Sequence, residues 1–386
     1  MVNVDYEAFG GLIQDFDDGH VPENLIGMEA STTTMTTTTT SVNNPTKLVY
    51  YPRFFDRPPA VHIFQDAMPP ALVDALYEKT FRIQTTSQTP WGAYVTVAQV
   101  QDFWKSKANC DNRTNHDDDD DDDNNISNNK GKVFVEDPVL EATAHFLELA
   151  MGRQGRSPTR IIPPSSSSNN EPISSLPLWT ADDLAQAHGV AVWALCAKPG
   201  SEVPYHLDYA EQVRYETGVI VPPLLAGTLH CTRDVVEGGA FQVALDGITH
   251  YQQYGYKCKK MIMADSTMMH GLESIPYHYN QVTCHAGHLP HASSKIIRIH
   301  GSQDRVIVGF NVFAPDIGPI VERAPEHSDT FRKMVKLQRW YTSRKGNTKH
   351  QTSLDLQTIQ RNRPLTKLLV LAKQEWENEF AAYQQE

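Results

Sequence analysis

Short apolar runs separated by Gly, Pro, Asp and Asn turns fill the sequence from Val190 to Phe313, and this texture constrains the fold more than any other feature. The runs are rich in β-branched and aromatic residues, which is typical of strands. Few long helical patterns separate them, so neighbouring strands are expected to pair in antiparallel fashion. The segments concerned are VAVWALCAKPG, TGVIVPPLLAGTLHCT, GGAFQVAL, HYNQVTCHAG, SSKIIRI and RVIVGFNVF. This part of the sequence predicts an antiparallel sandwich or barrel.

Helices are predicted before this region. The segment VHIF at residues 61–64 has the composition of a short strand, and Pro69 and Pro70 suit the start of a helix. Apolar residues between Leu72 and Tyr77 then recur at helical spacing, and a second such pattern covers Val139–Met151. We expect these helices to brace the sheet, which makes the protein α+β.

Low-complexity stretches divide the chain. They cannot bury enough apolar surface to offset the entropy of ordering, and they cover Ser31–Thr40, Asn109–Asn129 and Ser157–Ser175. The predicted organisation is a disordered tail over 1–46, a domain over 47–320 with solvated insertions at about 109–130 and 155–176, and a basic helical extension over 321–386.

Charge and cysteine content narrow the class of protein. The formal net charge is −12, but the run Asp117–Asp123 supplies seven of these charges, so the rest of the chain is only mildly acidic. The five cysteines are widely spaced and form no Cys-x-x-Cys pair, which argues against a disulfide framework and a zinc knuckle. The first residues lack the pattern of a signal peptide, and no window approaches a membrane span. We predict an intracellular protein, cytoplasmic or nuclear, without a membrane partner.

The strongest chemical signal is His206-Leu207-Asp208. Residues two apart on an extended strand share a face, so this imidazole and this carboxylate can bind one metal ion. A histidine from a later strand would complete a two-histidine, one-carboxylate set, which is typical of non-haem Fe(II) oxygenases. We favour His291, because a proline-marked turn delivers it to the beginning of the strand SSKIIRI. His285 and His288 remain alternatives among the 16 histidines.

Arg305 opens the strand RVIVGFNVF. Alternate residues from Val306 to Val312 form a wholly apolar face, whereas Arg305, Gly309 and Asn311 share the other face. If the second face borders a polar pocket, the planar guanidinium can hold a carboxylate through two parallel hydrogen bonds. Arg298, inside SSKIIRI, is the alternative anchor.

Four motifs in order, HLD, GGAF at Gly238–Phe241, LPH at Leu289–His291 and RVIVGFNVF, resemble the Fe(II)/2-oxoglutarate-dependent dioxygenase superfamily, in particular its prolyl-hydroxylase-like branch. The resemblance covers Val190–Phe313 and implies a double-stranded β-helix, or jelly roll. It implies that His206, Asp208 and His291 bind Fe(II) and that Arg305 holds 2-oxoglutarate, with dioxygen as second cosubstrate and ascorbate as a further candidate cofactor. The implied reaction is hydroxylation, foremost of a protein side chain such as proline, with conversion of 2-oxoglutarate to succinate.

Two segments leave alternatives open. Residues 242–280 are hard to align with the strands of the superfamily. We expect a lid or substrate loop there, and poorly packed core is the alternative explanation. The segment from Arg323 to Lys373 contains twelve Lys or Arg but only three acidic residues. This extension is therefore either a solvated helical appendage or a contact for nucleic acid. The alternative functions are an oxygenase of the same chemistry that acts on nucleic acid or a small molecule, and a non-catalytic jelly-roll binding module.

Overall fold

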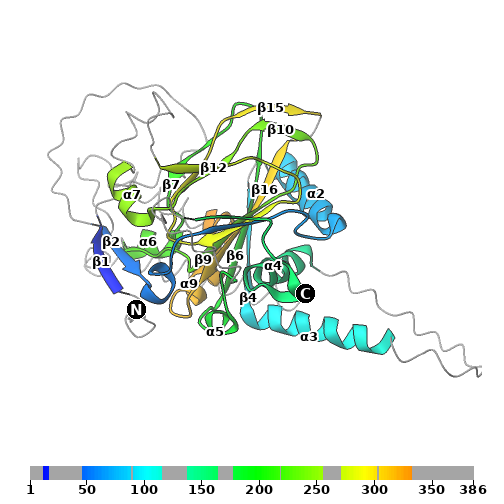
Figure 1. The fold of residues 1–386 in the computed structure, drawn as a ribbon, viewed down its shortest axis with the longest axis horizontal. Helices are drawn as coiled ribbons and strands as arrows, with labels where there is room; N and C mark the ends of the chain where they lie inside the picture. Colours follow the sequence, from blue (N-terminus) through cyan, green and yellow to red (C-terminus); the bar gives the residue numbers. More distant parts are fainter. Residues whose placement is uncertain are drawn as a thin grey trace, which may run out of the picture.

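Two antiparallel sheets form the centre of the protein, and helices cover the outer face of the larger sheet (Figure 1). The computed structural model describes residues 12–16, 46–87, 90–114, 137–163, 177–217, 219–254, 271–301 and 304–332. The predicted α+β class is confirmed at the level of mixed helices and large antiparallel sheets.

The larger sheet has seven strands in the order β4-β6-β16-β9-β13-β3-β5, and all neighbours are antiparallel. Its strands are β3 (Val61–Phe64), β4 (Trp91–Thr96), β5 (Arg160–Ile162), β6 (Gly189–Ala197), β9 (Leu225–His230), β13 (Val282–Ala286) and β16 (Arg305–Phe313). The longest strands, β6 and β16, lie side by side near one end of this sheet.

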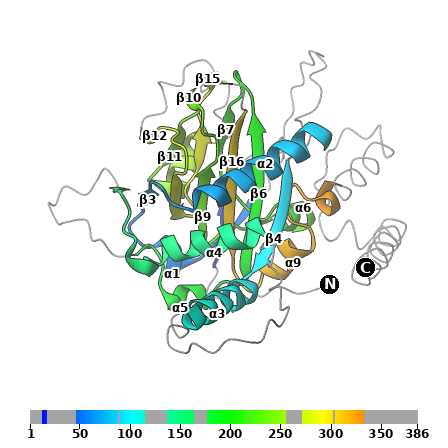
Figure 2. The same cartoon turned by 90° about the vertical axis from the view of Figure 1, so that its right-hand side faces the viewer.

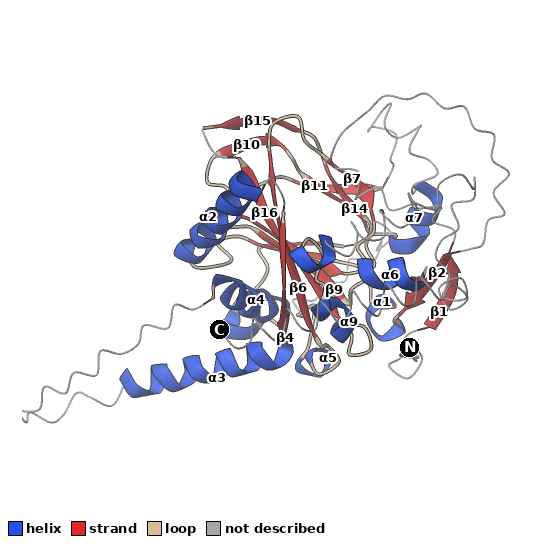
Figure 3. Ribbon diagram, turned by 180° about the vertical axis from the view of Figure 1, so that it is seen from behind, coloured by secondary structure: helices blue, strands red, loops and turns tan. Residues whose placement is uncertain are grey.

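The second sheet has four strands in the order β12-β11-β14-β7, and β11, β14 and β7 are labelled in Figure 3. These strands are β7 (Val203–His206), β11 (Phe241–Ala244), β12 (Leu272–Ile275) and β14 (His291–Ser293). Smaller sheets pair β10 (Val235–Gly238) with β15 (Ile296–His300), and β1 (Leu12–Phe16) with β2 (Thr46–Tyr50) and β8 (Val219–Ile220). Strand β1 was not expected, because it lies in the segment that we predicted to be a tail.

Helices α2 and α4 lie across the larger sheet (Figure 2). The helices are α1 (Pro52–Phe55), α2 (Pro70–Ser87), α3 (Val97–Thr114), α4 (Pro138–Ala150), α5 (Ala181–Leu184), α6 (Glu211–Thr217), α7 (Gly247–Tyr254) and α9 (Gly318–Arg323). Asp137 caps α4 by accepting a hydrogen bond from the Val139 backbone at 3.0 Å, and Phe146 on this helix stacks on Phe310 of β16 with ring centroids 4.6 Å apart. Both predicted helices are therefore present, and they brace the sheet.

Strand β16 separates the helix side of the larger sheet from its inner side. Val306, Val308, Phe310 and Val312 are fully buried in the hydrophobic core, as the alternation predicts. The opposite face carries Arg305 and Asn311, and both side chains are buried as well. A buried face with polar residues indicates that this side of the strand borders a site and not solvent.

Ion pairs to the buried Asp183 connect α1 and the residues after it to α5. Asp183 is fully buried, accepts a hydrogen bond from Arg57 at 2.7 Å and is also bonded by Arg53. It closes a capping box with Thr180 at the start of α5. Burial raises the pKa of the Asp183 carboxyl, but the hydrogen bonds from Arg57 and Thr180 outweigh burial and hold the pKa at about 2.

Two details of strand placement differ from the sequence prediction. Strand β7 ends at His206, so Asp208 lies just beyond the strand and not on it. His291 belongs to the separate strand β14, whereas SSKIIRI begins a new strand only at Ile296. Because the chain is interrupted between β14 and β15, His291 pairs within the four-stranded sheet, whereas Ile296–His300 pairs with β10.

Several predicted segments lie outside the described residues: the rest of the tail over 1–46, most of the two insertions, and residues 333–386 of the extension. In the 242–280 segment, β11, α7 and β12 are described, and 255–270 is not, so the predicted lid stays a prediction. Among the described helices none combines the length and apolar character needed to cross a membrane. The predicted intracellular location also stays a prediction.

Candidate metal centre

The predicted metal ligands converge at the edge of the four-stranded sheet. They are His206, Asp208 and His291. Strands β7 and β14 pair with His206 directly opposite His291, so the ladder itself brings the two imidazoles together. Their ring centroids are 4.5 Å apart. His206 Nε2 lies 3.2 Å from Asp208 Oδ1, and His291 Nε2 lies 3.8 Å from Asp208 Oδ2. In each residue one potential ligand atom lies within 4.8 Å of the others.

The second nitrogen of each imidazole is held by the backbone. His206 Nδ1 lies 2.7 Å from the carbonyl oxygen of Pro204, and His291 Nδ1 lies 3.0 Å from that of Leu289. A carbonyl oxygen only accepts, so each Nδ1 carries the proton and donates it. His291, a neutral imidazole, then keeps a lone pair on Nε2. His206 donates from Nε2 to Asp208 as well: burial lowers its pKa, but this hydrogen bond and the charge of Asp208 outweigh burial and raise it. A metal ion would take the place of that Nε2 proton.

The charges of the three groups are coupled. Burial raises the pKa of Asp208, but the nearby His291 and the hydrogen bond from His206 outweigh burial and hold the pKa well below its usual range. Asn311 on β16 also donates to this carboxylate. Burial lowers the pKa of His291 to about 3, so this imidazole is neutral at physiological pH. The set thus offers an ionised carboxylate and at least one neutral imidazole, the protonation states that metal binding needs.

The other candidate histidines do not join the set. His285 on β13 has its ring 5.5 Å from the His291 ring, and its Nδ1 faces the carbonyl oxygen of Ala286 at 2.9 Å. His288 packs against Phe55, with ring centroids 4.4 Å apart. Across the described ranges, His206, Asp208 and His291 are the one group of three such side chains close enough to share an ion.

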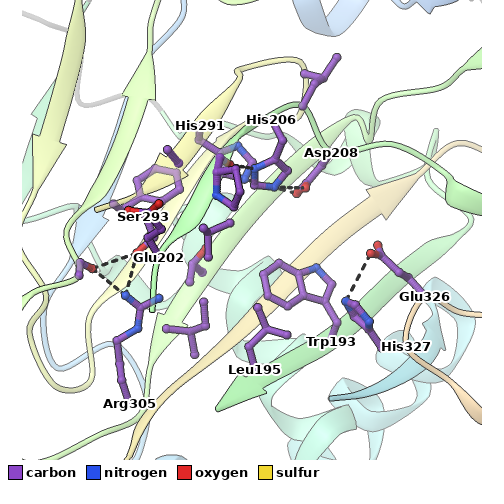
Figure 4. Close-up of a pocket in the computed structure, with 18 of the residues that line it drawn as sticks. Trp193, Leu195, Glu202, His206, Asp208, His291, Ser293, Arg305, Glu326 and His327 are labelled. Carbon is purple, nitrogen blue, oxygen red and sulfur yellow. Dashed lines mark hydrogen bonds and ion pairs between the residues drawn. The ribbon is translucent and has the colours of Figure 1, made fainter. Parts of the chain in front are cut away.

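The three side chains open into a cavity of about 680 Å³ between the two sheets. Figure 4 shows His206 and His291 on one side of the cavity and Arg305 and Trp193 on the other. This volume is in the range of pockets that bind small organic molecules. The cavity is the space into which the inner face of β16 points.

Arg305 reaches this cavity from the first position of β16. Its side chain is buried, and its Nη1 donates to the Gly239 carbonyl oxygen at 3.0 Å and to Ser293 Oγ at 2.7 Å. Among the described residues Nε has no hydrogen-bond partner. Since a buried guanidinium nitrogen rarely remains unpaired, this edge of the fork is suited to an acceptor that enters the cavity.

The glycine pair of the GGAF motif makes room for this arginine. Gly239 has a φ of +64°, and a Cβ there would lie 2.7 Å from Arg305 Nη1. A side chain at this position would therefore displace the guanidinium. By contrast, the rival anchor Arg298 is exposed on β15 and does not line the cavity.

Sequence reasoning missed several residues of the cavity wall. Trp193 comes from β6, where the alternation of residues marks it as inward but not as part of a site. Glu211 follows the HLD motif closely, at the start of α6, and its proximity to Asp208 was an available signal. Glu326 and His327 come from the segment after α9, which we assigned to the C-terminal extension. No pattern in that segment marks them.

Comparisons with known proteins find similarity in structure but not in sequence. No protein-family model matches the chain, and no curated protein matches it. The chain resembles a crystal structure of a Pseudomonas putida prolyl-4-hydroxylase, with 10% identity and a TM-score of 0.32 over 66% of this chain and 88% of the other. It also resembles HygX from Streptomyces hygroscopicus with nickel and 2-oxoglutarate bound, with 11% identity and a TM-score of 0.31 over 68% of this chain and 85% of the other.

A third similar structure is the viral collagen prolyl hydroxylase of Paramecium bursaria Chlorella virus-1 in complex with 2-oxoglutarate. The two chains are 9% identical, with a TM-score of 0.27 over 65% of this chain and 94% of the other. At such low identity, the chemistry of this chain has to be argued from its own residues.

Proposed function

We propose that this protein is an Fe(II)- and 2-oxoglutarate-dependent dioxygenase with a double-stranded β-helix core. One observation carries the proposal: His206, Asp208 and His291 present ligand atoms to one point, with both Nδ1 atoms held by backbone carbonyl groups. Backbone hydrogen bonds of this kind orient imidazoles for a metal. Packing alone does not require two buried Nε2 atoms to face one carboxylate.

The donor set fits Fe(II). Two imidazole nitrogens and one carboxylate oxygen are the ligands of non-haem Fe(II) oxygenases, and three protein ligands leave positions open for cosubstrates. His206, Asp208 and His291 would hold the metal. Bound iron supplies the chemistry in which dioxygen and 2-oxoglutarate yield succinate and carbon dioxide while one oxygen atom enters a substrate C–H bond. The protein's own task is to orient both cosubstrates and to exclude water.

Arg305 is the residue that would bind the carboxylate of 2-oxoglutarate remote from the metal. Its guanidinium lies in the same cavity as the metal ligands, and Thr228 and His230 line the cavity with it. Burial and the charge of Arg305 lower the pKa of His230 to about 3, so this imidazole is neutral. Arg305 is therefore the dominant positive charge available to a dicarboxylate here.

Iron-dependent turnover tests the proposal. We expect the purified protein to release succinate from 2-oxoglutarate only with Fe(II), and to lose both iron and succinate release in His206→Ala and Asp208→Ala. His300→Ala is the matched control, because His300 is a partly exposed histidine on β15 paired with Glu237. A wild-type protein that neither binds Fe(II) nor consumes 2-oxoglutarate would refute the proposal and favour the alternative of a non-catalytic jelly-roll binding module.

The substrate is a separate question. A protein or peptide side chain such as proline is the substrate that the sequence resemblance suggests, and hydroxylation of prolyl peptides is measurable in the same succinate assay. Stimulation of succinate release by a prolyl peptide, and not by an oligonucleotide or a small molecule, would support that choice. The wall of the cavity adds a further criterion.

A further inference from the structure

The cavity wall carries more negative than positive charge. Its carboxylates are Glu202, Asp208, Glu211 and Glu326, whereas Arg305 is its one Lys or Arg among the described residues. Under the proposed function, Asp208 binds the metal and Arg305 binds 2-oxoglutarate. Glu211 and Glu326 then remain for the substrate, whereas Glu202 is exposed and lies on the side of Ser293 and Arg305 (Figure 4).

The histidines of the wall do not neutralise these carboxylates. Burial lowers the pKa of His327 to about 4, and the nearby Arg332 lowers it further. His327 Nε2 lies 3.3 Å from Glu326 Oε1, but a neutral imidazole shares only a hydrogen bond with that oxygen. His230 is neutral for the reasons given above.

Cations behind the wall offset only part of the charge. Arg214 on α6 lies 5.0 Å above the Tyr209 ring, and its charge lowers the pKa of Glu211, against the larger effect of burial. Arg332 forms an ion pair with Asp329 and donates to the carbonyl oxygens of Pro90 and His327. Neither Arg214 nor Arg332 lines the cavity.

The pKa values of Glu211 and Glu326 are both raised, which favours the neutral forms of these carboxyl groups. Burial raises the pKa of Glu211 to about 7, and burial together with the charges of Glu211 and Asp208 raises the pKa of Glu326 well above its usual range. Carboxylates that repel each other in a confined space are stabilised by a cation placed between them.

The fold places Glu326 over the cavity by a close backbone crossing. Residues 324–328 follow α9 and pass over β4 at Gly92, where a Cβ would overlap the Glu326 carbonyl group. Trp193 borders the same region, with its ring 6.3 Å from the His327 ring (Figure 4). Gly309, which pairs with Trp193 across β6 and β16, leaves the space that the indole occupies.

We propose that the substrate of this site carries a protonated amine or a guanidinium, which binds between Glu211 and Glu326 beside the ring of Trp193. This inference rests on the proposed function, because it assigns the part of the cavity that the metal and 2-oxoglutarate leave free. Carboxylates and an aromatic face together form the environment that organic cations prefer. A polyanionic nucleic acid is disfavoured by the same charges.

Pairs of probes that differ only in charge test the proposal. N-acetyl-arginine amide is compared with N-acetyl-citrulline amide, and N-acetyl-lysine amide with N-acetyl-norleucine amide. Binding is measured by calorimetry on the full chain loaded anaerobically with Fe(II) and 2-oxoglutarate. We expect each cation to bind at least about tenfold more tightly than its neutral partner, as one charge-assisted contact would give. Alanine-based pentapeptides that contain Arg or citrulline then show whether the cation belongs to a polypeptide or to a small molecule.

Substitutions at the carboxylates locate the effect. We expect Glu326→Gln to reduce the preference for the cation about tenfold, with Glu211→Gln as a second variant if the first does not fold. Glu322→Gln is the matched control, because it also removes one negative charge, but from a residue on α9 that does not line the cavity. This variant should keep the wild-type preference for cationic probes.

Equal binding of charged and neutral probes would overturn the proposal, as would a preference that survives both Glu326→Gln and Glu211→Gln. Tighter binding of a single-stranded oligonucleotide than of either cation would overturn it as well. Succinate release is measured in parallel, so a preference for cations without iron-dependent succinate release would refute the proposed function alone.

Discussion

Replacing Arg305 with alanine removes the proposed anchor of 2-oxoglutarate. A charge-assisted, two-pronged contact to a carboxylate contributes roughly 1.5–3 kcal/mol. With a factor of ten for each 1.4 kcal/mol, the Kd of 2-oxoglutarate should rise about 10- to 150-fold. Iron binding should change little, because the guanidinium contacts Gly239 and Ser293 and none of the proposed metal ligands.

Calorimetric titration of 2-oxoglutarate into the protein loaded with Fe(II) measures this change, and iron content is determined on the same samples. Alanine also leaves two buried acceptors without the Arg305 donor, so the thermal unfolding midpoint is recorded to establish that the variant is folded. Arg305→Lys keeps the charge but cannot donate two parallel hydrogen bonds, and its Kd should lie between those of wild type and Arg305→Ala. Arg298→Ala is the matched control, because this arginine is exposed on β15.

A folded Arg305→Ala variant with the wild-type Kd for 2-oxoglutarate would refute this reasoning. If Arg298→Ala showed the loss instead, the anchor would be the alternative arginine, and the buried unpaired Nε of Arg305 would need another explanation.

Three further predictions concern the scaffold. The pKa of Asp183 in the folded protein is about 2, below its usual value of 3.8. The ionised carboxylate therefore contributes to stability above pH 4, and this contribution is lost as the pH falls toward 2. The difference in unfolding midpoint between wild type and Asp183→Asn should be large at pH 7 and shrink below pH 4. Gly92→Ala should lower the midpoint and weaken the preference for cationic probes in calorimetry, because a Cβ there displaces Glu326. Phe310→Ala removes a fully buried ring stacked on Phe146 and should cost roughly 3–5 kcal/mol in the free energy of unfolding measured with urea.

The sequence predicted well wherever local periodicity decides the structure. The alternation in β16 is determined by neighbouring residues, and it identified both the helix-packed face and the polar face with Arg305. The helical spacing of apolar residues in α2 and α4 likewise depends only on neighbouring residues. The position of His291 opposite His206 is different, because it depends on the register between two strands far apart in the sequence.

The remaining part of the site depends on chain crossings that no local pattern records. Residues 324–328 reach the cavity only because they cross β4 at a glycine, and Gly92 is an unremarkable residue in the sequence. For the same reason we assigned Glu326 to an extension and not to the pocket. A boundary drawn from composition cannot detect a segment that returns to the domain after its last strand.

Charge balance connects the two ends of the cavity. With iron and 2-oxoglutarate bound, the charges of the metal, Asp208, the dicarboxylate and Arg305 cancel, so the metal end of the cavity leaves no net charge for the substrate to neutralise. The other part of the cavity carries Glu211 and Glu326, whose pKa values are raised by burial and by neighbouring carboxylates, and Arg214 offsets this effect on Glu211 only in part. A neutral substrate would leave these pKa values raised, whereas a cation would relieve the repulsion and favour the ionised carboxylates. The proposed metal ligands and Arg305, which lie on or next to strands of the two sheets, therefore determine the reaction. Glu211 on α6 and Glu326 after α9 determine the charge of the substrate.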